Sequence, residues 1–406
     1  MSDNYAPAPP PHDRRRHRLV KPSRVAALGV VVAAGVGAIA STAGAANPAA
    51  APGLKLTKLA SMPAGVTNCD DIATLGTVDY TQIKIPIGHL FVSCSNGVQS
   101  DGSAGSSSKS DSSTLVEYTT AGKYVKQWSV ADEIAGMAAE PLHRRLLMPL
   151  NSSSNSEFVF LDPNIAGSFA EIQYAYSPNP ASTSAAKSLY TGGGTESVVV
   201  DSKDDIYVTA SDPKTLGATA TFKVVLSPPS GPPPAKGAAT LTRTFSDDAT
   251  AANGNTGKGT VKLALREIDA NAIVPTSSGK YGGDYVVDDT ATHQLVFSSD
   301  VSAGTGLTVL KTTVGLNDIR WATSSRGTFY LVSHGTQTPK GKSTLYKVTG
   351  SFVKGDAYAT TTSGDLVRVD LSNGKLTTLV SGIGTSVGLL YVNSDGTTTQ
   401  LAVNGS

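Results

Sequence analysis

The fold is decided by a stretch in the middle of the chain, TESVVVDSKDDIYVTASD, residues Thr195–Asp212. It opens with an apolar run, passes through the polar segment DSKDD, and continues with a second apolar run, IYVTA. Short runs rich in Val, Ile and Tyr that are separated by a polar turn are typical of antiparallel β-strands. This stretch therefore predicts a β-hairpin.

The same pattern returns along the chain. It is clear in GDYVVDDTATHQLVFSSD from Gly283 and in NDIRWATSSRGTFYLVSHG from Asn317, and looser in EIAGMAAEPLHRRLLMPLNS from Glu133. DDIATL with GHLFVSCS opens the series and SVGLLYVNSDGTTTQLAV closes it, which makes six starts. Further strand-like runs follow the starts, so each start with its followers predicts one four-stranded sheet.

Small sheets of this kind cannot bury both faces alone, so they are expected to stack around a central channel. We therefore predict an all-β fold, a β-propeller with six blades, with seven blades or a pair of two-sheet sandwiches as the alternatives. The last start lacks two outer strands, whereas GLKLTKLAS, Gly53–Ser61, precedes the first start as an extra strand. The closing blade is thus expected to be shared by N- and C-terminal strands.

The segments VVVDSKDDIYVTASD and NDIRWATSSRGTFYLVSHG resemble NHL repeats of the secreted actinobacterial type. In that family an apolar strand is followed by Asp, a polar turn and a Tyr-Val strand. The family's Pro-x-Gly lead-in is missing here. The resemblance implies a propeller and no particular activity.

Residues 1–45 have the features of an export signal. The basic segment RRRHRLVKPSR precedes an apolar run from Val25 to Ala40 and the A-x-A pattern at Ala43-Gly44-Ala45. The paired arginines resemble a twin-arginine signal, but Arg18 stands where that motif prefers Phe, so the general secretory route stays open. The alternative is an uncleaved anchor. We expect cleavage, a secreted protein and a single propeller domain over residues 46–406.

The balance of charge bears on partners. The chain has 33 Lys and Arg and 32 Asp and Glu, and most clustered basic charge lies in the first 24 residues. The rest is mildly acidic, so no nucleic-acid partner is expected, and after cleavage no membrane contact either. We expect a monomer that binds an extracellular ligand or protein. Polar segments near 99–113 and 228–260 predict flexible insertions.

Cys69 and Cys94 are the only cysteines. NCDDIATL and HLFVSCSN each predict a strand, and a hairpin between them would bring the two thiols face to face. A disulfide in an exported protein would then contribute about 3 kcal/mol by closing that loop. Two free buried thiols are the alternative.

Polar residues fall at one register when the strand starts are aligned. They are Asp70 or Asp71, Glu133, Glu196, Asp284, Asp318 and Ser386. Since the inner strand of each blade begins or ends at the channel, the carboxylates are expected to ring one mouth of it. Crowded carboxylates recruit a cation, and Ca²⁺ would be a natural guest to which Asn68 and Asn317 add amide oxygens. Alternatively, these residues cap backbone N–H groups or bind channel water.

Such a ring resembles the site of six-bladed calcium-dependent lactonases, in which Glu, Asn and Asp from different blades hold the ion. The Glu-Gly-Pro lead of their first blade is missing, and PAGVTNCDD stands in its place. The resemblance implies Ca²⁺ as a cofactor that polarises an ester or lactone carbonyl. Its implied ligands are Glu196, Asp284, Asn317, Asp318, Glu133 and Asp71.

Other motifs point to no specific chemistry. Gly384-Thr385-Ser386-Val387-Gly388 matches G-x-S-x-G, but a strand follows it where a nucleophile elbow requires a helix. The histidines of the predicted domain, His89, His143, His293 and His334, lie on different strands without ligand spacing. We therefore favour a binding module that acts through loops around the channel. A metal-assisted hydrolase or lyase at the channel mouth is the alternative.

Overall fold

The computed structural model describes residues 48–75, 88–105, 110–140, 144–153, 156–165, 167–177, 194–213, 217–334 and 342–394. The chain divides into a first part, Met1–Gly44, and a second part, Ala45–Ser406, to which all these residues belong. The expected export segment, residues 1–45, lies outside the described residues. Within the described ranges, no helix is long and apolar enough to cross a membrane.

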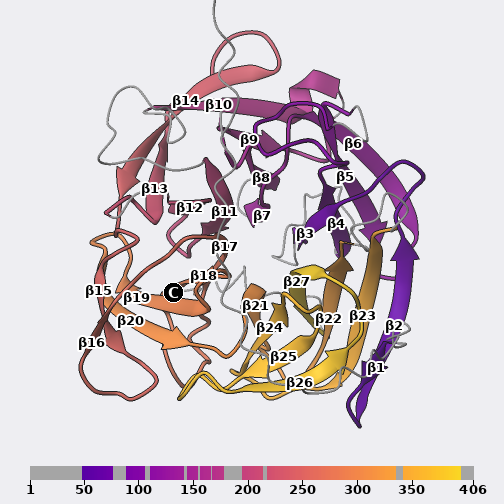
Figure 1. The fold of residues 1–406 in the computed structure, drawn as a ribbon. Helices are drawn as coiled ribbons and strands as arrows, with labels where there is room; N and C mark the ends of the chain where they lie inside the picture. Colours follow the sequence, from indigo (N-terminus) through magenta and orange to yellow (C-terminus); the bar gives the residue numbers. More distant parts are fainter. Residues whose placement is uncertain are drawn as a thin grey trace, which may run out of the picture. The chain divides into compact units, whose positions relative to one another are not determined.

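Nearly all regular structure in the described part is β-strand, arranged as four-stranded antiparallel units around a channel (Figure 1). From the channel outward, unit 1 contains β3 (Cys69–Ala73), β4 (His89–Cys94), β5 (Ser112–Thr119) and β6 (Tyr124–Ala131). Unit 2 contains β7 (Ala138–Glu140), β8 (Arg145–Leu150), β9 (Glu157–Leu161) and, after the 3-10 helix η1 (Gly167–Ala170), β10 (Glu171–Ser177). Unit 3 contains β11 (Thr195–Val200), β12 (Ile206–Ala210), β13 (Thr221–Leu226) and β14 (Ala235–Arg243).

The remaining units carry extra strands or exchange segments. Unit 4 contains β17 (Ile268–Ile273), β18 (Tyr285–Asp289), β19 (Gln294–Asp300) and β20 (Thr305–Lys311), with β15 (Thr250–Asn253) and β16 (Thr260–Lys262) at its outer edge. Unit 5 contains β21 (Leu316–Trp321), β24 (Ala357–Thr361), β25 (Leu366–Val369) and β26 (Leu376–Ser381), with β1 (Ala49–Ala50) at its edge. Unit 6 contains β27 (Ser386–Asn393), β22 (Arg326–Ser333), β23 (Thr344–Ser351) and β2 (Leu54–Ser61).

The innermost strands form a closed ring. In order around the channel they are β3, β7, β11, β17, β21 and β27, and each contacts the next, with β27 returning to β3. Their labels surround the centre of the view in Figure 1. Four-stranded sheets whose inner strands encircle an axis make a β-propeller. The predicted all-β propeller is therefore confirmed.

Apolar packing between neighbouring units holds the ring together. Among the described residues, the buried side chains form six clusters, and each cluster lies between two consecutive units. The cluster between units 3 and 4, for example, joins Tyr207 of β12 to Tyr285 and Val287 of β18. Because a unit buries its two faces only against its neighbours, the units are expected to stabilise one another in turn.

Strands from the two ends of the described part close the ring. N-terminal β2 pairs antiparallel with β23 as the outermost strand of unit 6, while C-terminal β27 pairs with β22 as its innermost strand. The prediction that N- and C-terminal strands share the closing sheet is confirmed. In addition, β1 pairs with β26 and so ties the N-terminal side to unit 5.

Two predicted starts differ from the structure, one in its position within a unit and one in its pairing. The start at Gly283 forms β18 and β19, the second and third strands of unit 4, whereas the inner strand is β17. The stretch Asn317–His334 is not a hairpin, because β21 pairs with β24 in unit 5 and β22 pairs with β23 and β27 in unit 6. Units 5 and 6 therefore exchange segments of chain, and local patterns do not reveal such long-range pairing.

The two expected insertions also contain regular structure. In the segment 228–260, β14 and β15 pair with strands of units 3 and 4, and β16 begins at Thr260. In the segment 99–113, the described residues include a turn in which Gly102 N donates to the Gln99 carbonyl, and β5 begins at Ser112. In the segment 228–260, apolar side chains such as Leu241 and Phe245 are also buried in the core.

Candidate ligand-binding site at the channel mouth

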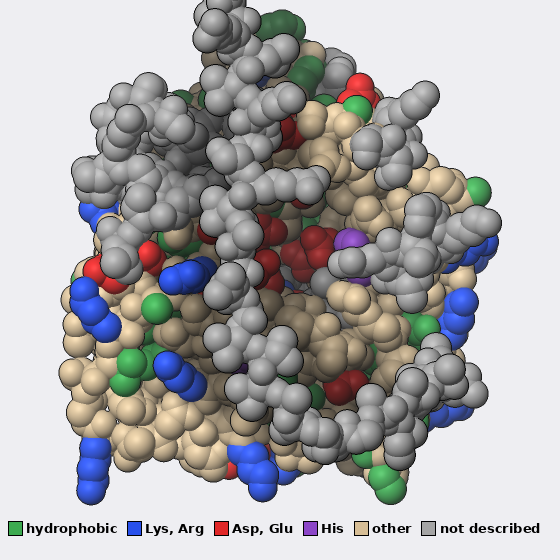
Figure 2. Space-filling view, in the orientation of Figure 1, with side chains coloured by type: hydrophobic (Ala, Val, Ile, Leu, Met, Phe, Trp, Pro, Cys, Tyr) green, Lys and Arg blue, Asp and Glu red, His purple; other side chains and the backbone are tan. Residues whose placement is uncertain are grey.

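A polar cavity of about 130 Å³ lies where the inner strands begin, at the end of the channel that we call the mouth. Asp and Glu side chains gather in the hollow at the centre of the face shown in Figure 2. The carboxyl-bearing residues that line the cavity are Asp70, Asp71, Glu196, Asp269 and Asp318. Its other polar lining residues are Ser197, Asn271, Asn317 and Arg320. The cavity is therefore lined by five carboxyl groups and one guanidinium group.

In each of four inner strands, a β-bulge lies beside the polar residues of the mouth. The pairing register shifts between Cys69 and Ile72 in β3, Thr195 and Val198 in β11, Ile268 and Ala270 in β17, and Leu316 and Asp318 in β21. A bulge adds a residue on one strand and redirects the side chains beside it. The polar residues of the mouth lie within or next to these shifts, so the same local irregularity, repeated around the ring, presents them to the channel.

Two glycines allow the inner strands to approach closely at the mouth. A Cβ atom on Gly388 of β27 would lie 2.6 Å from the Asp70 carbonyl oxygen, and one on Gly136 would lie 2.3 Å from the Glu196 carbonyl oxygen. Both distances are shorter than a real Cβ contact allows. Glycine at these positions thus lets β27 lie against β3 and the segment before β7 lie against β11.

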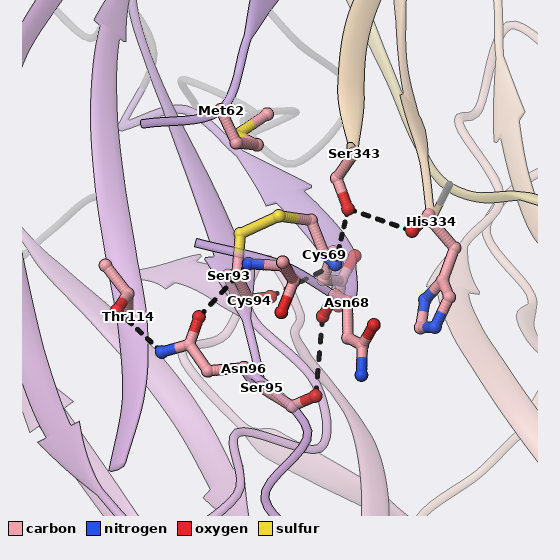
Figure 3. Close-up of a disulfide and its surroundings, with 12 residues drawn as sticks. Met62, Asn68, Cys69, Ser93, Cys94, Ser95, Asn96, Thr114, His334 and Ser343 are labelled. Atoms are coloured by element: carbon pink, nitrogen blue, oxygen red, sulfur yellow. Dashed lines mark hydrogen bonds between the residues drawn. A yellow bond between two sulfur atoms is a disulfide. The ribbon is translucent and has the colours of Figure 1, made fainter. Parts of the chain in front are cut away.

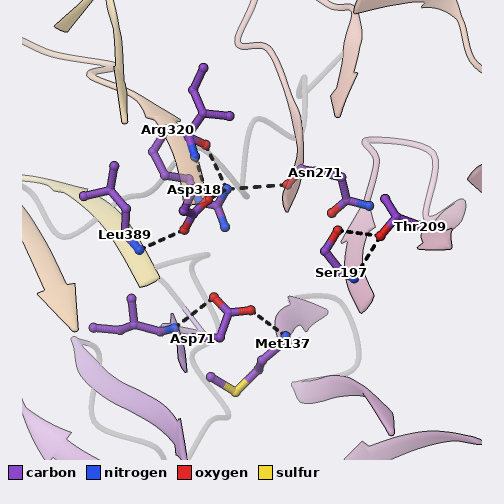
Figure 4. Close-up of polar contacts among 10 residues, drawn as sticks. Asp71, Met137, Ser197, Thr209, Asn271, Asp318, Arg320 and Leu389 are labelled. Atoms are coloured by element: carbon purple, nitrogen blue, oxygen red, sulfur yellow. Dashed lines mark hydrogen bonds and ion pairs between the residues drawn. The ribbon is translucent and has the colours of Figure 1, made fainter. Parts of the chain in front are cut away.

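One side of the cavity is a network of hydrogen bonds and an ion pair (Figure 4). Arg320 Nη1 lies 2.6 Å from Asp318 Oδ1, and Asp318 Oδ2 accepts a hydrogen bond of 2.8 Å from Leu389 N. Asp71 accepts hydrogen bonds from the backbone N–H groups of Ile72 and Met137. These two carboxylates connect unit 5 to unit 6 and unit 1 to unit 2, so they stabilise the ring itself.

The other carboxyl groups have fewer partners. Burial raises the pKa of Asp70 to about 8, and repulsion from Asp71 and Asp269 adds to the effect. Burial also raises the pKa of Asp269 to about 7, although a hydrogen bond from Thr290 opposes the shift. The pKa of Glu196 lies well above its ordinary value for the same reason. At neutral pH the Asp70 carboxyl group therefore holds its proton most of the time, and a positive charge in the cavity would favour the ionised form of all three groups.

Most of the sequence-predicted residues converge at this mouth. Asp71, Glu196, Asn317 and Asp318 line the cavity, as does Asp70. Glu133 is not a lining residue, but its charge raises the pKa of Asp70 and Glu196, and it accepts hydrogen bonds from Ser152. The side chain of Ser386 lies outside the described residues.

Asp284 is the exception, and its expected position at the mouth is corrected. It precedes β18, whose first residue, Tyr285, pairs with Ile273 at the far end of β17. It therefore lies at the end of unit 4 away from the mouth, and Asp269 occupies the place expected for it. The error came from taking β18 as the inner strand.

The expected calcium site does not fit the geometry of the described residues. Within the described part of the chain, no three His, Cys, Asp or Glu side chains are grouped so that they could hold a metal ion. Asp71 and Asp318 already accept backbone hydrogen bonds, and Asp318 is paired with Arg320. Asn68, the other expected contributor, lies beside the disulfide (Figure 3) and does not line the cavity.

Four polar lining residues, Ser197, Asp269, Asn271 and Arg320, were not predicted from the sequence. Asp269 and Asn271 lie in IDANAI, whose polar residues hide its strand character, and Arg320 follows Asp318 by two residues. Residues two apart in a strand share a face, so the alternation within IDANAI and NDIR was the available signal.

The predicted disulfide between Cys69 and Cys94 is confirmed (Figure 3). It pairs β3 with β4 directly before Asp70, and both cysteines are fully buried. Cys69 N donates to Ser343 Oγ, which in turn donates to the carbonyl of His334. The bridge thus ties β3 to β4, and the hydrogen bond from Cys69 N to Ser343 holds the start of β3 against unit 6 at the mouth.

The remaining sequence candidates do not assemble an active site. Ser386 is the first residue of strand β27, so the G-x-S-x-G segment lacks the helix of a nucleophile elbow. His89 pairs with Glu117, and His293 lies in the turn between β18 and β19. Burial lowers the pKa of His334 beside the disulfide. His143 lies outside the described residues.

No family model and no curated protein matches the chain. Among solved structures it is similar to one in a nidogen/laminin complex, with 9% identity, a TM-score of 0.41, and coverage of 80% of this chain and 85% of that chain. It is similar to streptogramin B lyase, with 9% identity, a TM-score of 0.40, and coverage of 86% of this chain and 95% of that chain. A protein of unknown function from Bacteroides caccae has 12% identity, a TM-score of 0.40, and coverage of 80% and 86%. Likenesses this distant carry no argument about activity or ligand.

Proposed function

We propose that this chain is an exported binding protein whose propeller holds a small, positively charged ligand at the mouth of its channel. The observation that carries the proposal is the charge of the cavity, in which five carboxyl groups meet one guanidinium group. That guanidinium is already paired with Asp318. The remaining carboxyl groups are buried and therefore poorly hydrated, which disfavours their ionised forms. A cationic ligand would stabilise those ionised forms.

Export is part of the same proposal. A disulfide fits an extracellular protein, because oxidising compartments allow such bonds to persist. The export signal expected in residues 1–45 would deliver the chain there. A propeller with a polar mouth is then suited to capture of a ligand from the medium, since propeller loops and channels commonly form binding surfaces.

The proposal is tested by calorimetric titration of the purified chain with n-butylamine, choline and CaCl₂ as cations, and with acetate and glucose as uncharged or negative controls. We expect saturable binding of at least one cation and none of acetate or glucose. Glu196→Gln, which removes one lining carboxylate, should weaken that binding about tenfold, or about 1.4 kcal/mol. Glu157→Gln, on β9 away from the cavity lining, is the matched control. Binding of glucose or acetate alone would contradict the proposal.

A catalytic role is the second candidate, and the pKa values of Asp70 and Asp269 favour it. At about 8 and about 7, these carboxyl groups could exchange protons with a substrate near neutral pH. The reaction class would be hydrolysis or elimination on an ester or lactone. A screen of chromogenic esters and lactones should then show turnover that Asp70→Asn and Asp269→Asn reduce at least a hundredfold. Equal turnover by the parent and both variants would exclude these carboxyls from the reaction.

A further inference from the structure

The cavity has two unlike sides. The carboxyl groups of one side are held by Arg320 or by backbone N–H groups, although Arg320 Nε has no hydrogen-bond partner among the described residues. On that side, Asp71, Asp318 and Arg320 bind one another or backbone groups, as described above. On the other side lie Asp70, Glu196 and Asp269, with no cationic side chain among the described lining residues next to them. Only neutral donors serve them there, since Ser211 hydrogen-bonds to Glu196 and Thr290 donates to Asp269. No hydrogen bond reaches the Asp70 carboxyl group from the described residues.

Asn271 supplies an independent observation on the same side. Asn271 is only 3% exposed and lines the cavity. Its Oδ1 has no hydrogen-bond partner among the described residues. Its Nδ2 donates to the carbonyl of Tyr207 at 3.3 Å and to the hydroxyl of Tyr285 at 3.2 Å. A carbonyl oxygen can only accept, so the contact with Tyr207 sets which amide atom is nitrogen. The buried Oδ1 is thereby left as an acceptor without a donor, which is unfavourable unless a ligand supplies one.

Ser197 presents a second acceptor. Ser197 N donates to Thr209 Oγ1 at 3.0 Å, and the Thr209 hydroxyl proton is directed to the carbonyl of Ile268 at 3.3 Å. The Ser197 hydroxyl therefore donates its proton to Thr209 Oγ1, which lies 3.0 Å from Ser197 Oγ. Figure 4 shows Ser197 with Thr209 and beside Asn271, across from Arg320. The Ser197 oxygen therefore offers lone pairs to the cavity.

When its carboxyl groups are ionised, every free group on this side accepts hydrogen bonds, so the fitting guest is a cation that donates several of them. An ammonium group has three N–H donors arranged around a compact charge, whereas a quaternary ammonium has none. A calcium ion needs six to eight oxygen ligands, and the described residues do not group even three acidic or imidazole ligands for one. A cavity of about 130 Å³ holds an ammonium group with the first carbons of its chain.

We propose that Asn271, Ser197, Asp269, Glu196 and Asp70 form a subsite for a primary ammonium group carried on an unbranched alkyl chain. The chemistry is shared by free alkylamines and by lysine side chains, whose remaining atoms would project from the mouth. This inference rests on the proposed function, because it specifies the cation that the cavity binds.

The test compares four probes by calorimetric titration: n-butylamine, Nα-acetyl-lysine amide, tetramethylammonium and CaCl₂. We expect the two primary amines to bind at least tenfold more tightly than tetramethylammonium and Ca²⁺. Tighter binding of acetyl-lysine amide than of butylamine would identify a peptide as the source of the ammonium group, and the reverse order a free amine. Either order supports the subsite.

Two variants and a matched control locate the binding. Asp269→Asn removes a negative charge and should reduce the affinity for butylamine at least tenfold. Ser197→Ala removes one hydrogen-bond acceptor and should reduce it about threefold. Asp284→Asn makes the same change in the same unit at the far end of β17 and should leave the affinity unchanged. The melting temperature of each variant, measured in parallel, shows that it is folded.

The outcomes separate this inference from the proposed function. Tighter binding of Ca²⁺ or tetramethylammonium than of the amines would overturn the ammonium subsite and leave a cation-binding cavity. Amine binding that Asp284→Asn weakens as much as Asp269→Asn would place it elsewhere and overturn the subsite. Binding of no cation at all would overturn both.

Discussion

Asp70 shows at the scale of one residue how folding shifts the pKa of a carboxyl group. Its pKa of about 8 in the folded chain lies above the ordinary value of 3.8, so between these values the folded chain binds more protons than the unfolded chain. Stability contributed by this group is therefore present at low pH and is lost as pH rises from about 4 to about 8. Glu196 and Asp269 shift in the same direction and add to the slope.

Asp70→Asn should raise the melting temperature at pH 8 and change it little at pH 4.5. The gain at pH 8 should be at least about 1.4 kcal/mol, the equivalent of one pKa unit, because the amide carries no charge to bury. Thermal unfolding at both pH values measures it, with Asp101→Asn on an exposed turn as the control. An equal shift of the melting temperature at the two pH values would show that the pKa of Asp70 is not raised in the folded chain.

The disulfide also acts at the residue scale. Cys69 and Cys94 are 25 residues apart, so reduction should lower the free energy of unfolding by about 3 kcal/mol through the freedom returned to the unfolded chain. Urea unfolding with and without a reductant gives this difference. The double variant Cys69→Ser, Cys94→Ser should match the reduced chain and be insensitive to reductant. An unchanged urea midpoint on reduction would refute the prediction.

At the scale of the strand, the mouth depends on the close approach of β27 to β3. Gly388→Ala should destabilise the chain by about 2 kcal/mol or more, because the added methyl group meets the Asp70 carbonyl and the Asp71 backbone. The change should also weaken cation binding by displacing both carboxyl groups. Gly279→Ala is the matched control, since nothing lies within 4 Å of its added Cβ atom. Melting temperature and butylamine titration report the two effects, and equal behaviour of the two variants would contradict them.

Strand identity explains why Asp284 was misplaced. The prediction followed apolar runs, and YVV in β18 is a more regular strand pattern than IDANAI in β17. The inner strand of unit 4 is the less apolar of the two because its polar residues face the channel. In unit 4 the site-bearing strand is thus harder to recognise locally than the structural strand that pairs with it.

At the scale of the molecule, closure of the ring makes the first strands essential. Removing residues 48–61 deletes β1 and β2, leaves β23 without its outer partner, and uncovers the edge of unit 6. We expect the shortened chain to lose its cooperative thermal transition or to melt at least about 10 °C lower, as a propeller opened at its closing unit would. A synthetic peptide spanning residues 46–61, added in trans, should restore part of the loss. A shortened chain that melts like the parent would show that closure does not depend on these strands.

The amino-acid sequence by itself determined that this chain is all-β, that its strands repeat as small sheets around a channel, and that its two cysteines can bridge neighbouring strands. These features rest on local patterns of apolar residues and turns, which every repeat carries in its own segment. It also predicted that Asp71, Glu196 and Asp318 meet, because equal register in repeated units implies a common axis.

Only the tertiary structure decided which strand of unit 4 lines the channel, how units 5 and 6 exchange segments, and which carboxyl groups stay without a cation. Those outcomes depend on pairing between distant segments, such as β22 with β27, and on the bulges that turn side chains inward. The placement of Asp269, Asn271 and Arg320 follows from that pairing. Long-range pairing is selected by the burial of whole faces between neighbouring units, a quantity that no single stretch of sequence contains.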